Sequence, residues 1–277
     1  MQPTEENVYS KLQEHDFSRV ARRSVLPVLV TVLFIAIAEI FMLSGIKGAS
    51  ILLHMFILII VSINTVRIKD KYVAWALQAL MLLPLMRLIN FSMPIFSELM
   101  LYRYFYVYIP MFIPIFLIIR HQSFSPVQLG LSFKRIILYL PLSLVFGLLI
   151  AEVEYFIIPV SPLVPNMSFY NMVDVALIMV FCVGLIEELM FRSILQTRLE
   201  GVFGSTTGII VTSLLFGIMS SVYGSIPEVI FAFLVGLILG FMFNKTRSLP
   251  FVALTHGLVN IFLFVLIPLL GSGLRII

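Results

Sequence analysis

The residues best suited to chemistry in this 277-residue sequence lie in one short stretch, Gly184 to Arg192. Glu187, Glu188 and Arg192 follow an apolar run, Val175 to Ile186, that is typical of a membrane helix. On insertion scales each such charge costs about 2.5–3.5 kcal/mol at mid-bilayer, so three together require partners or water. This stretch is therefore the strongest functional signal in the chain.

A helix through this stretch would give its two carboxylates different surroundings. Glu188 and Arg192 are i,i+4 neighbours with the acid on the N-terminal side, which is the better orientation for an ion pair. Glu187 is rotated about 100° away from Glu188 and lacks that partner. We therefore expect Glu188 to be held by Arg192 and Glu187 to stay free for chemistry.

Two further polar points interrupt the apolar pattern of the last hundred residues. Ser220 and Ser221 end one apolar run, and His256 and Asn260 lie near the start of the last one. His256 and Asn260 are i,i+4, so they share a helix face that should look inward rather than into lipid. The spacing predicts that these groups and Glu187 meet at a similar depth in one wet cavity.

The composition indicates an all-α, polytopic membrane protein. The chain is 61% hydrophobic and 12% charged, and apolar stretches of about 20 residues are typical of transmembrane helices. No basic patch with interleaved aromatic residues indicates a nucleic-acid partner, and the single Cys182 allows no intrachain disulfide. We expect eight or nine helices, nine if all of the following span: 25–45, 49–66, 73–91, 100–119, 136–153, 172–192, 206–221, 228–244 and 250–269.

Basic residues predict the orientation of these spans. Thirteen Lys and Arg residues fall in the N-terminal tail and alternate connections, against three on the other side, when Arg87 and Arg192 are left out as intramembrane. The positive-inside rule then places the N-terminus in the cytoplasm. We expect a cytoplasmic tail over 1–24, N-terminal transmembrane helices over 25–124 and a core over 125–277, with the site facing the cytoplasm.

Several isolated residues have simpler interpretations. Gly236 and Gly240 form a small-xxx-small pattern that predicts close helix packing. Glu39 in the first span is predicted to be structural, either paired with another helix or protonated, although a role as a functional acid is the alternative. Glu154 is near the end of its span and is interpreted as a boundary residue.

The order of these motifs resembles a known family. EExxxR at Glu187–Arg192, FG at Phe216–Gly217, GLILG at Gly236–Gly240 and HxxxN at His256–Asn260 are similar to the CPBP family of intramembrane proteases. That family includes the type II CAAX prenyl endopeptidases and bacterial relatives linked to bacteriocin self-immunity. The resemblance covers about residues 125–265.

The resemblance implies a role for each matching residue. Glu187 is similar to the glutamate that activates water as general base, and Glu188 and Arg192 to the pair that fixes the helix and the base. His256 and Asn260 resemble the side chains that stabilise the oxyanion. The chemistry is physically reasonable, because a poorly solvated carboxylate is a stronger base and each oxyanion donor contributes about 2.7–4 kcal/mol.

One position departs from the family pattern. The second motif of the family is FxxxH, and here Phe216 leads to Ser220 in place of the histidine. Serine can hold a water molecule but cannot take a proton near neutral pH. A general-base partner contributes about 10²–10⁴-fold, so the substitution weakens the expected catalysis without necessarily abolishing it.

The sequence thus favours an intramembrane endopeptidase that acts on a membrane-presented peptide, hydrophobic or prenylated, by a glutamate-activated water. The alternatives are a catalytically impaired homologue that binds a membrane partner and, third, a small-solute transporter. A catalytic zinc site is disfavoured, because it commonly needs two histidines and a carboxylate, whereas Glu187, Glu188 and His256 supply one histidine. No cofactor is expected.

Overall fold

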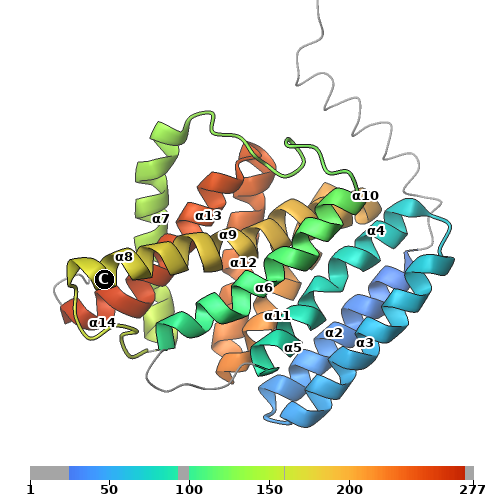
Figure 1. Cartoon of the computed structure of the whole chain (residues 1–277), viewed down its shortest axis with the longest axis horizontal. Helices are drawn as coiled ribbons and strands as arrows, with labels where there is room; N and C mark the ends of the chain where they lie inside the picture. The colour runs from blue at the N-terminus through green and yellow to red at the C-terminus, as the bar shows by residue number, and fades with distance from the viewer. Residues whose placement is uncertain (1–24, 93–99, 159, 272–277) are drawn as a thin grey trace, which may run out of the picture.

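The computed structural model describes residues 25–92, 100–158 and 160–271, and the predicted tail over 1–24 lies outside them (Figure 1). The described residues contain helices and no strand, as the composition predicts. Nine of the helical segments are long and apolar enough to cross a membrane. The all-α, polytopic fold is confirmed, and the nine candidate spans among the described residues match the larger of the two expected numbers.

The first four candidate spans form the N-terminal part of the bundle. They are α2 (Leu26–Leu43), α3 (Lys47–Arg67), the pair α4 (Lys71–Leu80) and α5 (Leu82–Ser92), and α6 (Met100–His121). Asp70 begins α4 by accepting hydrogen bonds from the N–H groups of Tyr72 and Val73. The break at Met81 between α4 and α5 has a cause in Pro84, which has no N–H to donate to the carbonyl four residues earlier.

The last five candidate spans carry the predicted site residues. They are α7 (Ile136–Ile157), the continuous helix Phe169–Phe203, α11 (Ser205–Met219) with the 3₁₀ turn η3 (Ser220–Tyr223), α12 (Ile226–Thr246), and the helix Leu249–Leu270. The last of these comprises α13 (Leu249–Ile261), η4 (Phe262–Leu266) and α14 (Ile267–Leu270). Residue Ser225 caps the start of α12 by accepting a hydrogen bond from the N–H of Glu228.

The continuous helix Phe169–Phe203 is the central element of the fold. It consists of α8 (Phe169–Ala176), η1 (Leu177–Gly184), α9 (Leu185–Glu188), η2 (Leu189–Gln196) and α10 (Thr197–Phe203). Both η1 and η2 are π-helical, a geometry that is frequent at functional sites. The helix has 35 residues and crosses the width of the molecule in Figure 1. At 1.5 Å per residue it is about 50 Å long, well beyond the bilayer core of about 30 Å.

Glycines allow the helices around this element to approach closely. A Cβ on Gly236 would lie 3.1 Å from the Cα of Ser213 in α11, and one on Gly240 would lie 3.1 Å from the side chain of Gln196. The interpretation of Gly236 and Gly240 as packing residues is confirmed. Large apolar side chains are exposed on the outer faces of the bundle, for example 84% of Ile137 and 57% of Phe181, as expected of surfaces that contact lipid.

Candidate active site

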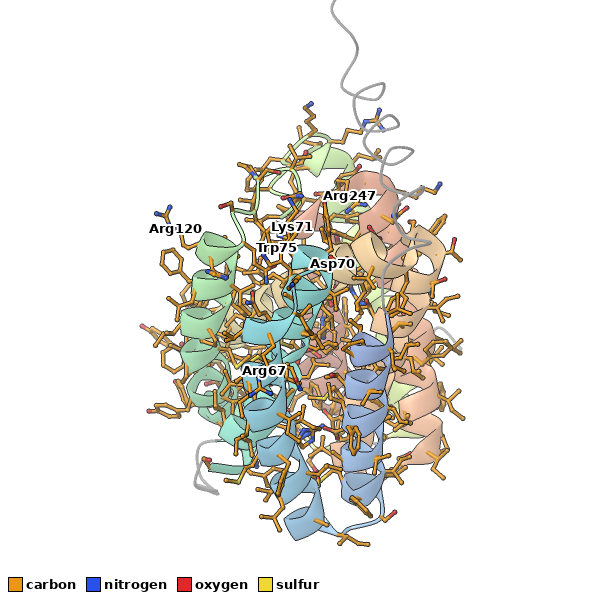
Figure 2. All side chains as sticks on the ribbon, turned by 90° about the vertical axis from the view of Figure 1, so that its right-hand side faces the viewer. Arg67, Asp70, Lys71, Trp75, Arg120 and Arg247 are labelled. Carbon is orange, nitrogen blue, oxygen red and sulfur yellow. The ribbon has the colours of Figure 1, made fainter. Side chains whose placement is uncertain are left out.

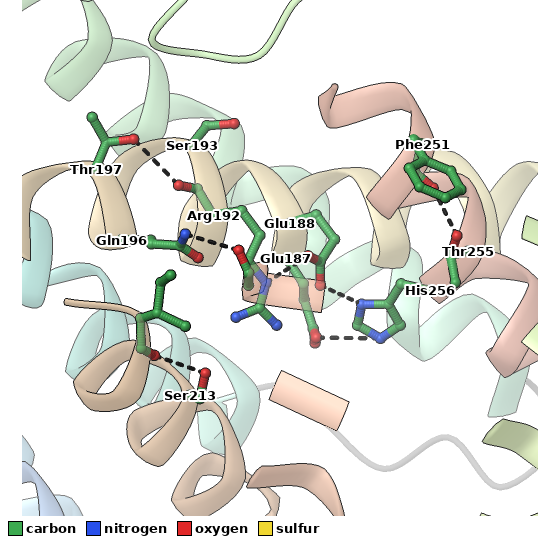
Figure 3. A network of polar contacts seen from close by, with 12 residues as sticks. Glu187, Glu188, Arg192, Ser193, Gln196, Thr197, Ser213, Phe251, Thr255 and His256 are labelled. Atoms are coloured by element: carbon green, nitrogen blue, oxygen red, sulfur yellow. Dashed lines mark hydrogen bonds and ion pairs between the residues drawn. The ribbon is translucent and has the colours of Figure 1, made fainter. Parts of the chain in front are cut away.

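Glu188 is the anchor of the polar cluster on the central helix. Its Oε2 accepts a hydrogen bond from Arg192 Nε at 2.8 Å, and its Oε1 lies 2.9 Å from His256 Nδ1 on α13 (Figure 3). Glu188 and Arg192 are both fully buried. The predicted i,i+4 pair is therefore present, and the same carboxylate also fixes the imidazole from another helix.

The guanidinium of Arg192 is enclosed by aromatic rings. Its Cζ lies 4.8 Å from the ring centroid of Phe216 and 5.9 Å from that of Phe191. Within the described residues its two terminal nitrogens have no hydrogen-bond partner. The charge is thus balanced by Glu188 on one side and by aromatic faces on the other, an environment suited to a planar guanidinium.

Glu187 is not free, contrary to the expectation from its place on the helix. The hydroxyl of Tyr108 on α6 donates a hydrogen bond to its Oε1. Its Oε2 lies 3.6 Å from His256 Nε2, an ion-pair distance that is too long for a hydrogen bond. Glu187 therefore faces an imidazole that Glu188 holds from behind, and a phenol from the N-terminal part of the chain orients it.

Glu187, His256, Asn260 and Ser220 line one cavity of about 330 Å³. Asn260 is 8% exposed, and its Nδ2 has no hydrogen-bond partner among the described residues. Glu188 and Arg192 lie behind the cavity wall rather than on it, so the structure divides the six predicted residues into four that line the cavity and two that support it.

A close helix crossing brings the glutamates to the histidine. A Cβ on Gly184 would lie 2.6 Å from the carbonyl oxygen of Ala253, and a Cβ on Gly257 would lie 2.7 Å from the Cα of Val180. Both distances are shorter than real Cβ contacts, so only glycine fits at these two positions. The two glycines flank the reactive residues in sequence and set the spacing between Glu188 and His256.

The first spans also build the site, although they lie outside the resemblance. Arg87 on α5 lines the cavity and donates two hydrogen bonds to Glu39, from Nε at 2.9 Å and from Nη2 at 2.8 Å. Glu39 is fully buried and contacts His54 Nε2 at 3.0 Å, and Ser221 donates a hydrogen bond to it. The predicted pairing of Glu39 with another helix is confirmed.

This buried cluster ends at the turn that carries Ser220. Besides its bonds to Glu39, Arg87 Nη2 donates to the backbone carbonyl of Met219 at 2.6 Å. Because Met219 and Ser221 flank Ser220, the cluster fixes the backbone of Ser220 from both sides. Sequence reasoning missed this support, and the intramembrane charges of Glu39 and Arg87 were the signal that could have revealed it.

Glu154 is a further lining residue that the sequence did not assign to the site. The interpretation as a boundary residue is incomplete, because Glu154 belongs to the last turn of α7 and also lines the cavity. Glu228 lines the cavity from α12, and one of its carboxylate oxygens is buried without a hydrogen-bond partner in the described part of the chain. The cavity therefore extends from Glu187 to an end that is lined by the carboxylates of Glu154 and Glu228.

The arrangement of the cavity's ionisable side chains bears on whether it could hold a zinc ion. In the described ranges no three His, Cys, Asp or Glu residues are arranged to hold a metal. His256 is the cavity's histidine, and its Nδ1 faces Glu188. A catalytic zinc site would require further nitrogen or carboxylate ligands at this point.

The helix ends that line the cavity indicate toward which side of the bundle it lies. Consecutive spans alternate in direction, and the cavity is lined from the end of α5, the start of α6, the end of α7 and the start of α12. These ends lie on the side opposite to the start of α2. The cavity and the start of α2 therefore lie at opposite ends of the bundle, and the predicted cytoplasmic N-terminus and cytoplasm-facing site both stay predictions.

Comparison with known proteins identifies the segment that carries this site. No curated protein and no solved structure matches the chain. Residues 170–262 match the family described as type II CAAX prenyl endopeptidase Rce1-like. This range contains Glu187, Glu188, Arg192, His256 and Asn260, and it confirms the resemblance inferred from the motifs. The similarity to this Rce1-like family covers about a third of the chain, and it is the third that carries the polar cluster.

Proposed function

We propose that this protein is an intramembrane endopeptidase that hydrolyses a peptide bond in a membrane-presented substrate. The observation that carries the proposal is the pairing of Glu187 with His256 Nε2 across 3.6 Å on the wall of one cavity. A carboxylate and an imidazole at this distance can act on one water molecule and one carbonyl group. The family match to CAAX-type endopeptidases supports the same reaction.

Glu187 begins the reaction as general base. It takes a proton from a water molecule in the cavity, and the water oxygen forms a bond to the carbonyl carbon of the scissile peptide. The carbonyl π electrons move to oxygen and give a tetrahedral oxyanion. The protonated Glu187 then delivers its proton to the leaving nitrogen as the C–N bond breaks, which leaves a carboxylic acid and an amine.

His256 and Asn260 stabilise the oxyanion. Among the described residues the Nδ2 of Asn260 has no competing hydrogen bond, and Glu188 stabilises the positive charge of His256 through Nδ1. Glu188 in turn is held by Arg192. Donors that are fixed in place before reaction are effective because they need no reorganisation at the transition state.

Ser220 positions the water in place of the usual histidine. It lines the same cavity as Glu187, and its backbone is fixed by the cluster of Glu39 and Arg87. In this scheme residues 125–277 supply the catalytic groups, α5 and α6 complete the wall, and the N-terminus lies in the cytoplasm. The substrate is a hydrophobic or lipid-modified peptide, since it must enter a bundle surrounded by lipid.

Purified protein in nanodiscs, incubated with a library of hydrophobic and prenylated peptides, tests the proposal by mass spectrometry of the products. Glu187→Gln is expected to abolish cleavage while the thermal unfolding temperature stays within a few degrees of wild type. Full cleavage by Glu187→Gln would refute the mechanism. A wild-type protein that binds peptides and cleaves none would instead favour the binding homologue, for which the missing histidine is the specific argument.

A further inference from the structure

The cavity lies on one side of the membrane-spanning bundle. Its polar lining residues at that side come from five different helix ends: Asn90, Arg103, Glu154, Tyr223 and Glu228. Leu163, from the connection between α7 and α8, also lines it. No residue of the connections 68–70, 122–135 or 247–248 is among the lining residues. The cavity therefore opens from Glu187 toward the helix ends that carry the connections 44–46, 158–168 and 224–225.

Basic residues concentrate at the opposite side. Lys71, Arg120 and Arg247 lie toward one end of the molecule in Figure 2, with Arg67 nearer the middle, and the connection between α6 and α7 crosses the top of Figure 1. In the described ranges the basic residues on this side are Arg67, Lys69, Lys71, Arg120, Lys134, Arg135, Arg198, Lys245 and Arg247, whereas Lys47 and Arg103 lie on the cavity side. The excess of Lys and Arg marks the cytoplasmic face.

We propose that the site opens away from the cytoplasm, so that its substrate is a peptide segment presented at the outer face of the membrane. That the site takes a substrate rests on the proposed function, whereas the direction in which it opens rests on the placement of the lining side chains. It corrects the expectation of a cytoplasm-facing site and keeps that of a cytoplasmic N-terminus. It disfavours the C-terminal tail of a prenylated cytoplasmic protein, because such a tail would approach the closed, basic side.

A continuous series of polar side chains supports the outward opening. Ionisable side chains inside a bilayer occur where water or a partner reaches them, and Glu154, Glu228 and Arg103 belong to the first or last turns of their helices. Tyr223, which is 45% exposed, continues this polar path to the surface of the bundle. Toward the basic side, by contrast, Glu187 is followed by the fully buried Glu188, Arg192 and Ser193.

Cysteine labelling in intact cells tests the direction of opening. The chain has one cysteine, Cys182, so Cys182→Ala supplies a cysteine-free background. Three matched serine substitutions then report three places: Ser161→Cys in the connection 158–168, Ser125→Cys in the connection 122–135, and Ser220→Cys in the cavity. Ser161 and Ser125 are both exposed. The probe is a charged, membrane-impermeant methanethiosulfonate.

We expect Ser161→Cys and Ser220→Cys to react in intact cells and Ser125→Cys only after permeabilisation. The proposal is overturned if Ser220→Cys reacts in the pattern of Ser125→Cys, or if Ser125→Cys reacts in intact cells and Ser161→Cys does not. Val222→Cys, which is 48% exposed and lines the cavity, replaces Ser220→Cys if the latter variant fails to fold.

Vesicles of known orientation separate this inference from the proposed function. Added peptide should be cleaved by right-side-out vesicles at least tenfold faster than by inverted ones. Cleavage confined to inverted vesicles would overturn the outward opening and leave hydrolysis intact. Labelling of Ser220→Cys from outside without cleavage in either orientation would support the opening and refute the protease.

Discussion

Replacing Gly184 with alanine should separate the glutamates from the histidine. The added Cβ would lie 2.6 Å from the carbonyl oxygen of Ala253, whereas ordinary contacts begin at 3.4 Å. Because the obstructing atom is backbone, the two helices must move apart by the difference, about 0.8 Å. The 2.9 Å contact between His256 Nδ1 and Glu188 would then lengthen to about 3.7 Å, beyond hydrogen-bond range.

Two quantities should change together in Gly184→Ala. A misplacement of about 1 Å costs about 10²-fold in rate, and overpacking costs about 1–3 kcal/mol of stability. The rate is measured as kcat on a peptide that the wild type cleaves, and stability as the thermal unfolding midpoint in the same detergent. We expect a fall of about two orders of magnitude in kcat and a lower midpoint.

Gly201→Ala is the matched control on the same continuous helix. The nearest atom to its added Cβ is 4.0 Å away, in the ring of Tyr72. Alanine is favoured over glycine in a helix by about 1 kcal/mol, so this variant should be neutral or slightly stabilised. If Gly184→Ala kept the rate and midpoint of Gly201→Ala, the close crossing would not position the site and the reasoning would be wrong.

Three further changes test other parts of the site. Tyr108→Phe removes the donor to Glu187 and should lower kcat about tenfold with little change in unfolding midpoint; an unchanged kcat would show that the phenol does not orient the base. Glu39→Gln leaves Arg87 as an uncompensated buried charge and should cost about 3–5 kcal/mol in the free energy of unfolding, measured by denaturant titration in micelles; a loss below about 1 kcal/mol would contradict a tight pair. Ser220→His should raise the cleavage rate about 10²-fold if the position adjoins the reacting water, and no gain in a folded variant would remove Ser220 from the proposed mechanism.

The fold was largely predictable because the apolar spans are long and their boundaries are polar. Each of the nine ranges overlaps a helix of the structure. The sixth span is longer than predicted, since it extends from Phe169 to Phe203 rather than from 172 to 192. Its polar last turns pack inside the bundle, where Arg198 contacts Gln122 at 2.6 Å, and hydropathy alone cannot reveal that partner.

The site was predictable where its residues are close in sequence and not where they come from distant helices. The spacing of Glu188 and Arg192 predicts their ion pair, and the pair is present. The bond from Tyr108 to Glu187 joins residues 79 positions apart, and the sequence showed Tyr108 as one of four alternating tyrosines. Helical spacing does place Tyr104 and Tyr108 on one face, which is the signal that could have separated them from exposed Tyr102 and Tyr106.

Because the helix Phe169–Phe203 is long, its tilt in the membrane should depend on the thickness of the bilayer. A segment of about 50 Å can enter a hydrocarbon layer of about 30 Å only by leaning steeply or by extending into the headgroup regions. Lipids with shorter or longer acyl chains would alter that lean, and the carboxylates at its centre would rotate with it. The acyl-chain length of the surrounding lipids would thus affect the relative orientation of Glu187 and His256.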